Sequence, residues 1–97
     1  MARVALSEGA RADLDRLFEF LAADDLRAAA EALDIIVDAL EILRRHPLVG
    51  RPCEEGLREL VISRGRTGYV ALYEFFEAED VVLVLALRHQ REAGFPD

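Results

Sequence analysis

The sequence predicts a single α+β domain in which a helical hairpin packs on a small, mainly antiparallel sheet, in the order β-α-α-β-β-β. Two long segments in the first half of the chain repeat apolar residues with helical spacing. Three short segments in the second half are rich in β-branched and aromatic residues and are separated by turn-forming residues. With 97 residues, the chain has the length of one domain, residues 1–97.

The first expected elements are a short strand over Arg3–Leu6 and a helix that follows Ser7 and ends near Ala23. Ser7 can cap this helix, because its hydroxyl accepts a hydrogen bond from a backbone N–H of the first turn. Apolar residues then recur on one helical face at i, i+3, i+4 and i+7, namely Leu14, Leu17, Phe18 and Leu21. This face is most simply a core-facing one.

A second, longer helix is expected after Asp24–Asp25, which supply its N-cap. Its apolar positions run from Leu26 to Leu43 with helical spacing. Arg44–His46 place cationic or polar groups at the negative end of the helix dipole, and Pro47 ends the helix. The link between the two helices is short, so they should form an antiparallel hairpin.

The second half of the chain is predicted to form three consecutive antiparallel strands after a turn-rich linker over 47–52. The expected strands occupy residues 57–63, 69–76 and 81–87, and the turns between them occupy residues 64–68 and 77–80. The last strand is an unbroken apolar run, which predicts a central strand buried on both faces. The N-terminal strand should join the sheet at an edge or beside the last strand. A polar tail, Arg88–Asp97, follows.

Composition excludes several classes of protein. The net charge of −7 argues against binding bulk nucleic acid by neutralising phosphates, although all twelve basic residues are arginine. Neither a signal peptide nor a membrane-spanning run is visible, so we expect a soluble, cytoplasmic protein without membrane contact. The single cysteine, Cys53, fits a reducing compartment. An incidental loop thiol is favoured over a nucleophile paired with His46 or His89. We expect no metal site and no cofactor.

Three motifs, in their order and spacing, resemble the RelE/ParE superfamily of type II toxin–antitoxin systems. The first is the strand, serine and helix start, VALSEGARADL at 4–14. The second, HPLVGRP at 46–52, is similar to the family's H-P-x-x-G-R-P linker. The third comprises sheet segments, LRELVI at 57–62, YVALY at 69–73 and LALRHQRE at 85–92. The resemblance covers nearly the whole chain. It implies a toxin that a cognate antitoxin keeps silent.

The resemblance implies one of two activities, cleavage of mRNA on the ribosome by RelE-like members or poisoning of DNA gyrase by ParE-like members. RNA cleavage through the 2′-hydroxyl needs a base, an acid and cations. This chain has no lysine, and Phe95 stands where the ribonuclease branch has a tyrosine. A nuclease built on Arg88, His89 and Arg91 stays open as the alternative, since arginine clamps phosphate and histidine exchanges protons near neutral pH. We therefore favour the gyrase poison. An inert binding module is a third reading.

A gyrase poison needs binding residues and no catalytic set. The candidates for contact with the target are Arg51, Arg64, Arg66, Tyr73, Arg88, Arg91 and Phe95. Structural roles compete for each of them, since tyrosines at spacing four in a strand are more often core or rim residues. The candidates for contact with the antitoxin are Leu14, Leu17, Phe18 and Leu21, because a helix in a groove is a common binding mode. An acidic toxin should prefer a basic, apolar-anchored partner segment. No direct DNA binding by the toxin alone is expected.

Overall fold

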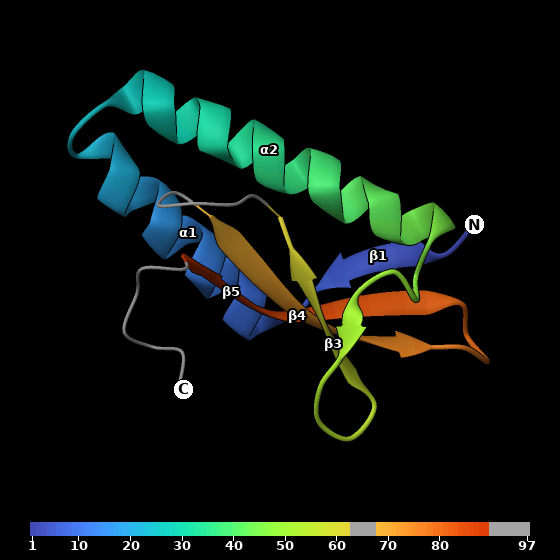
Figure 1. Cartoon of the computed structure of the whole chain (residues 1–97). Coiled ribbons are helices and arrows are strands. Elements are labelled where there is room, and N and C mark those ends of the chain that lie inside the picture. The colour runs from blue at the N-terminus through green and yellow to red at the C-terminus, as the bar shows by residue number, and fades with distance from the viewer. Residues whose placement is uncertain (63–67, 90–97) are drawn as a thin grey trace.

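A computed structural model describes residues 1–62 and 68–89 of the chain (Figure 1). The elements are β1 (Arg3–Leu6), α1 (Glu8–Ala22), α2 (Leu26–Arg45), β2 (Arg51–Pro52), β3 (Leu57–Val61), β4 (Tyr69–Phe76) and β5 (Val81–His89). The predicted order is confirmed, with the two-residue strand β2 added inside the expected linker. Residues 63–67, which include most of the hairpin loop expected over 64–68, and residues 90–97 of the expected tail lie outside the described residues.

The strands form one sheet in the order β1-β5-β4-β3-β2. β3, β4 and β5 make the predicted antiparallel meander, and β2 adds to the outer side of β3. β1 pairs in parallel with β5, so it lies both at an edge and beside the last strand. The sheet is therefore mainly antiparallel with one parallel pair.

Both helices begin at the predicted caps. The hydroxyl of Ser7 accepts a 3.0 Å hydrogen bond from the N–H of Ala10. The carboxylate of Asp25 accepts from the N–H groups of Arg27 and Ala28, at 3.0 and 3.3 Å. These bonds satisfy donors that have no partner inside a helix. The helices fold back on one another and cover one face of the sheet (Figure 1).

The core lies between the helices and the sheet face that they cover. Its largest fully buried side chains are Tyr73, Ile36, Leu43, Leu87, Val82 and Val84. The prediction that the last strand is buried on both faces is wrong. In β5 the residues directed at the helices are fully buried, whereas Val81, Leu83 and Leu85 are only partly buried. The reason is that both helices lie on the same side of the sheet.

Two strand boundaries also differ from the prediction. β5 continues to His89, so Arg88 and His89 belong to the strand rather than to the polar tail. The strand predicted over 57–63 ends at Val61. The register shifts between Leu72 and Tyr73, a bulge that inserts one extra residue into β5.

Within the described ranges, no helix has the length and apolar content that would let it cross a membrane.

Candidate functional site

Tyr73 in β4 anchors the linker that follows α2. Its side chain is fully buried. Its hydroxyl donates a 2.8 Å hydrogen bond to the carbonyl of Pro47 and accepts one of 2.8 Å from the N–H of Gly50. Burial raises the pKa of this hydroxyl, so it stays protonated and able to donate. The predicted contact between Tyr73 and a target is inconsistent with this burial. Tyr73 positions the linker instead.

Arg58 in β3 holds the same linker through its guanidinium group. One nitrogen donates to the carbonyls of Leu48 and Gly50, at 3.1 and 2.8 Å. Gly50 lies so close to the sheet that a Cβ there would be 2.6 Å from the hydroxyl of Tyr73 and 2.8 Å from the carbonyl of Glu59. Only glycine fits at this position, which gives the Gly-Arg-Pro sequence of the linker a steric reason.

Arg51, the first residue of β2, is a surface residue with a 76% exposed side chain. It lies opposite Glu59 of β3 and donates a 2.9 Å hydrogen bond to the carboxylate of Glu59. This hydrogen bond and the charge of Glu59 raise the pKa of Arg51. The pair joins β2 to β3 at the edge of the sheet, and the exposed part of Arg51 remains accessible to a partner.

Arg88 in β5 is bound by α1. Asp13 accepts hydrogen bonds from the guanidinium of Arg88 and, at 2.9 Å, from the N–H of Leu87. Since β1 pairs with β5 only as far as Val84, the edge of β5 beyond this point would otherwise be open. Ser7 donates at 3.3 Å to the carbonyl of Leu85 on the same edge. Arg88 is therefore part of the seam between α1 and the sheet.

The described part of the chain shows no cluster of the candidate cations around His89. The ring of His89 packs edge-to-face on Tyr69, with 5.3 Å between the centroids. Arg64, Arg66, Arg91 and Phe95 lie outside the described residues. The possible nuclease set of Arg88, His89 and Arg91 is thus described only in its first two members, and Arg88 is paired with a carboxylate. Across residues 1–62 and 68–89, no group of three possible ligands could hold a metal ion.

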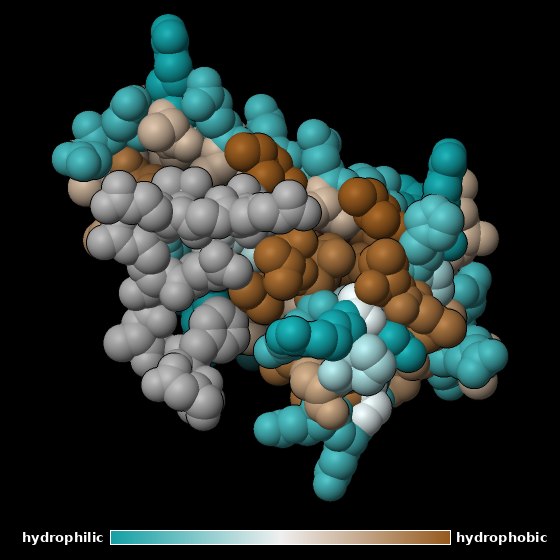
Figure 2. Space-filling view, in the orientation of Figure 1, coloured by the Kyte–Doolittle hydropathy of each residue, from teal (hydrophilic) through white to brown (hydrophobic). Residues whose placement is uncertain are grey.

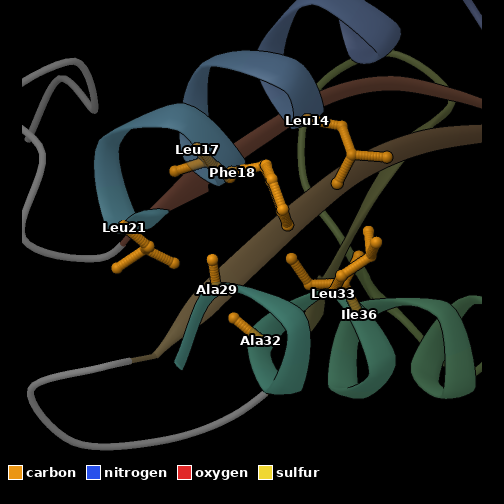
Figure 3. A pocket seen from close by; sticks show the side chains of 8 residues that line it. All are labelled: Leu14, Leu17, Phe18, Leu21, Ala29, Ala32, Leu33 and Ile36. Atoms are coloured by element: carbon orange, nitrogen blue, oxygen red, sulfur yellow. The ribbon is translucent and has the colours of Figure 1, made fainter. Parts of the chain in front are cut away.

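The apolar stripe of α1 divides between core and surface. Its four members and Ala29, Ala32, Leu33 and Ile36 of α2 line one small pocket between the two helices (Figure 3). Leu17 is buried, and Leu14 and Leu21 pack against the core, so all three help to hold the hairpin together. Leu14 and Phe18 also line an open groove with Leu33. The prediction that Leu17 contacts a partner is inconsistent with its burial, whereas Leu14 and Phe18 stay candidates.

Two exposed apolar residues of the linker were not among the candidates predicted from the sequence. Leu48 and Val49 have exposed fractions of 58% and 55%, although the backbone around them is hydrogen-bonded to the sheet. Ile42, near the end of α2, is also exposed. Figure 2 shows hydrophobic residues gathered between α2 and the strands on the viewed face. Two adjacent apolar residues in a turn-rich linker were the sequence signal for this surface.

Comparison with known proteins identifies the family. The model of the ParE toxin of the type II toxin–antitoxin system parDE matches residues 4–94. The chain is 36% identical over 92 residues to Toxin RelE3 of Caulobacter vibrioides, which covers 95% of the chain and 98% of the relative. Among solved structures, it resembles the chromosomal ParDE system of P. aeruginosa with a TM-score of 0.76 and 22% identity, covering 92% and 96% of the two chains. It also resembles the RelBE2 toxin–antitoxin complex of Mycobacterium tuberculosis with a TM-score of 0.63 and 26% identity, covering 94% and 93%. The chain belongs to the ParE toxin family of type II toxin–antitoxin systems, within the RelE/ParE superfamily.

Proposed function

We propose that this chain is a growth-inhibiting toxin that binds and poisons DNA gyrase and is neutralised by a cognate antitoxin. The chain belongs to the ParE toxin family. Two solved structures that the chain resembles are a toxin–antitoxin system and a toxin–antitoxin complex. The proposal requires protein surfaces that bind partners, and it requires no catalytic group.

The pairing of Arg88 with Asp13 is the observation that carries the choice of target. A ribonuclease of this fold needs free cations that stabilise the additional charge on the phosphate during cleavage. In this chain, Asp13 pairs with Arg88 and, at 3.5 Å, with Arg16, and Glu59 pairs with Arg51. A carboxylate beside each of these arginines opposes phosphate binding and favours a target that is a protein.

The helix-free face of the sheet supports the same choice. The register sets Glu59 opposite Leu72 and Glu74 opposite Leu83 on that face. Val61 and Phe76 lie on the same face, and their exposed fractions are 50% and 38%. A surface that combines apolar side chains, the carboxylate of Glu74 and the Arg51–Glu59 pair suits a protein surface better than RNA phosphates.

Ribosome-dependent cleavage of mRNA is the second candidate function. The observation that favours it is the 36% identity to a relative named Toxin RelE3. On this alternative, His89 and Arg91 would act together with Arg88, which would first have to leave Asp13.

For the antitoxin we propose the groove of the helical hairpin, defined by Leu14, Phe18 and Leu33 on its floor and Asp15 and Glu19 on its rim. An apolar floor suits the buried side of an amphipathic segment. The acidic rim favours lysine or arginine beside these anchors, because complementary charge speeds encounter and excludes wrong partners. The cognate antitoxin should therefore carry a basic, apolar-anchored segment.

Expression of the chain alone in a bacterial host tests the proposed function. We expect growth arrest, and we expect relief when the product of the adjacent small reading frame is expressed with it. A Phe18→Asp variant should still arrest growth but should no longer be relieved, because the change opposes binding in the groove without touching the linker. Normal growth with the wild-type chain at full expression would contradict the toxin proposal itself.

A further inference from the structure

We propose that the linker patch, defined as Leu48, Val49 and Arg51, is the surface with which this toxin contacts its protein target. The inference rests on the proposed function and adds the place of contact. Leu48 and Val49 are adjacent, and more than half of each side chain is exposed. Such a pair on a small domain needs an explanation when it lies beside further apolar surface.

The backbone of the linker patch is held rigidly, although its side chains are directed to solvent. Arg58 donates to the carbonyls of Leu48 and Gly50, and Tyr73 binds the carbonyl of Pro47 and the N–H of Gly50. The N–H of Val49 donates to the carbonyl of His46 at 3.1 Å. A contact surface that is fixed before binding loses little conformational freedom when a partner docks. This combination of a fixed backbone and exposed apolar side chains suits a binding epitope better than a simple connection.

An open cleft lies beside the linker patch. Leu48 forms one wall, and Leu57 and Phe75 of the sheet provide further apolar lining. Its volume is about 220 Å³, which is below the range of roughly 300–1,000 Å³ that is usual for small-molecule sites. The cleft is large enough for a side chain of a protein partner. Leu48 and Val49 would enter the partner while one of its side chains enters the cleft.

The charges around the linker patch define the partner further. On the side of α2 the rim is cationic or polar, with Arg45 and His46 exposed. On the side of the turn before β3 the rim is acidic, with Glu54 and Glu55 exposed. A matching partner presents an apolar pocket with carboxylates toward α2 and cations toward the turn. The hairpin groove has Asp15 and Glu19 on its rim and shares no residue with the linker patch, so the antitoxin segment proposed above fits the groove and not this patch.

Growth arrest by variants expressed without antitoxin tests the inference, because the antitoxin then plays no part. The test variant is the double substitution Leu48→Asp and Val49→Asp, and a second variant carries serine at both positions. The matched control is Phe20→Asp, since Phe20 is 73% exposed on α1 and belongs to neither surface. Thermal melting and immunoblots establish that each variant is folded and accumulates like the wild-type chain.

We expect the wild-type chain and Phe20→Asp to arrest growth, and both linker variants to need about 10- to 100-fold more protein for the same arrest. Folded linker variants that arrest growth as strongly as the wild type would overturn the inference and leave the proposed function intact. A wild-type chain that does not arrest growth would instead contradict the proposed function, and the assignment of a target surface would fall with it.

Discussion

The hydroxyl of Tyr73 accepts a 2.8 Å hydrogen bond from the N–H of Gly50, which lies 23 positions earlier in the chain. The same hydroxyl donates to the carbonyl of Pro47. These bonds join the H-P-x-x-G-R-P linker to the Y-x-x-x-Y strand, two sequence motifs that are far apart in the chain. The tyrosine is needed because its hydroxyl serves both linker groups, and the glycine is needed because no Cβ fits against that hydroxyl.

Replacement of Tyr73 by phenylalanine should destabilise the fold by about 1–3 kcal/mol, because the N–H of Gly50 and the carbonyl of Pro47 lose a buried partner. Urea unfolding followed by circular dichroism measures the change. Tyr69→Phe is the matched control: Tyr69 is also buried in β4, but its hydroxyl makes no hydrogen bond within residues 1–62 and 68–89. Equal stability of Tyr73→Phe and the wild type would contradict the proposed anchor.

Stability should fall in alkaline solution. Burial raises the pKa of Tyr73 and of Tyr69 above the ordinary value of 10.0. The unfolded chain therefore loses these protons at lower pH than the folded chain. Their contribution is fully present below about pH 10 and is lost as the pH rises through the folded pKa values. Urea midpoints measured from neutral pH upward should show this decline, and the decline should be smaller in Tyr73→Phe. An identical decline in both proteins would count against burial of Tyr73 as its cause.

Two glycines should respond oppositely to alanine. At Gly50 the added Cβ would be 2.6 Å from the hydroxyl of Tyr73 and 2.8 Å from the carbonyl of Glu59. We expect a loss of about 1–3 kcal/mol, as for overpacking of a core. At Gly9 in α1 the nearest atom would be the Leu85 carbonyl oxygen at 3.4 Å, so a gain of up to about 1 kcal/mol is expected from helix propensity. Thermal melts of the two variants give the comparison, and a tolerated Gly50→Ala would disprove the close approach.

The seam between α1 and β5 should show energetic coupling between Asp13 and Arg88. Asp13→Ala leaves the N–H of Leu87 without its acceptor, which should cost about 1–3 kcal/mol. Arg88→Ala should cost less, because its side chain is about one-third exposed and solvent weakens the ion pair. A double-mutant cycle with Asp13→Ala, Arg88→Ala and the double variant measures the coupling in urea. Strictly additive losses would argue that Arg88 is free of Asp13 in solution.

Local signals were sufficient to predict most of the fold. The caps at Ser7 and Asp25 and the helical spacing of apolar residues placed both helices, because each signal depends on neighbours in the sequence. The seam between Asp13 and Arg88 could not be predicted in this way, since its two residues are 75 positions apart. That β5 is fully buried on one face only could not be predicted, because an apolar run does not reveal whether helices cover the second face of the sheet.

The candidate site was only partly predictable for the same reason. The α1 stripe was identified from its spacing, but which of its members are buried in the hairpin and which line the groove depends on where α2 packs. Tyr73 stayed a candidate for target binding because the sequence does not show whether a tyrosine in a strand lies in the core or at the rim. Only the position of the linker, which covers its hydroxyl, decides between these two places. The linker patch could be recognised only from the structure, because the hydrogen bonds that fix its backbone cannot be predicted from Leu48 and Val49 themselves.

The most direct test of the proposed function is supercoiling by purified bacterial DNA gyrase in the presence of the purified chain without antitoxin. We expect the chain to inhibit supercoiling at micromolar concentration or below, and we expect the double substitution at Leu48 and Val49 to weaken this inhibition. In parallel, primer extension on translated mRNA should show no new cleavage. Unimpaired gyrase at micromolar concentrations of a chain that arrests growth, together with cleaved mRNA, would contradict the gyrase proposal and support the ribonuclease alternative.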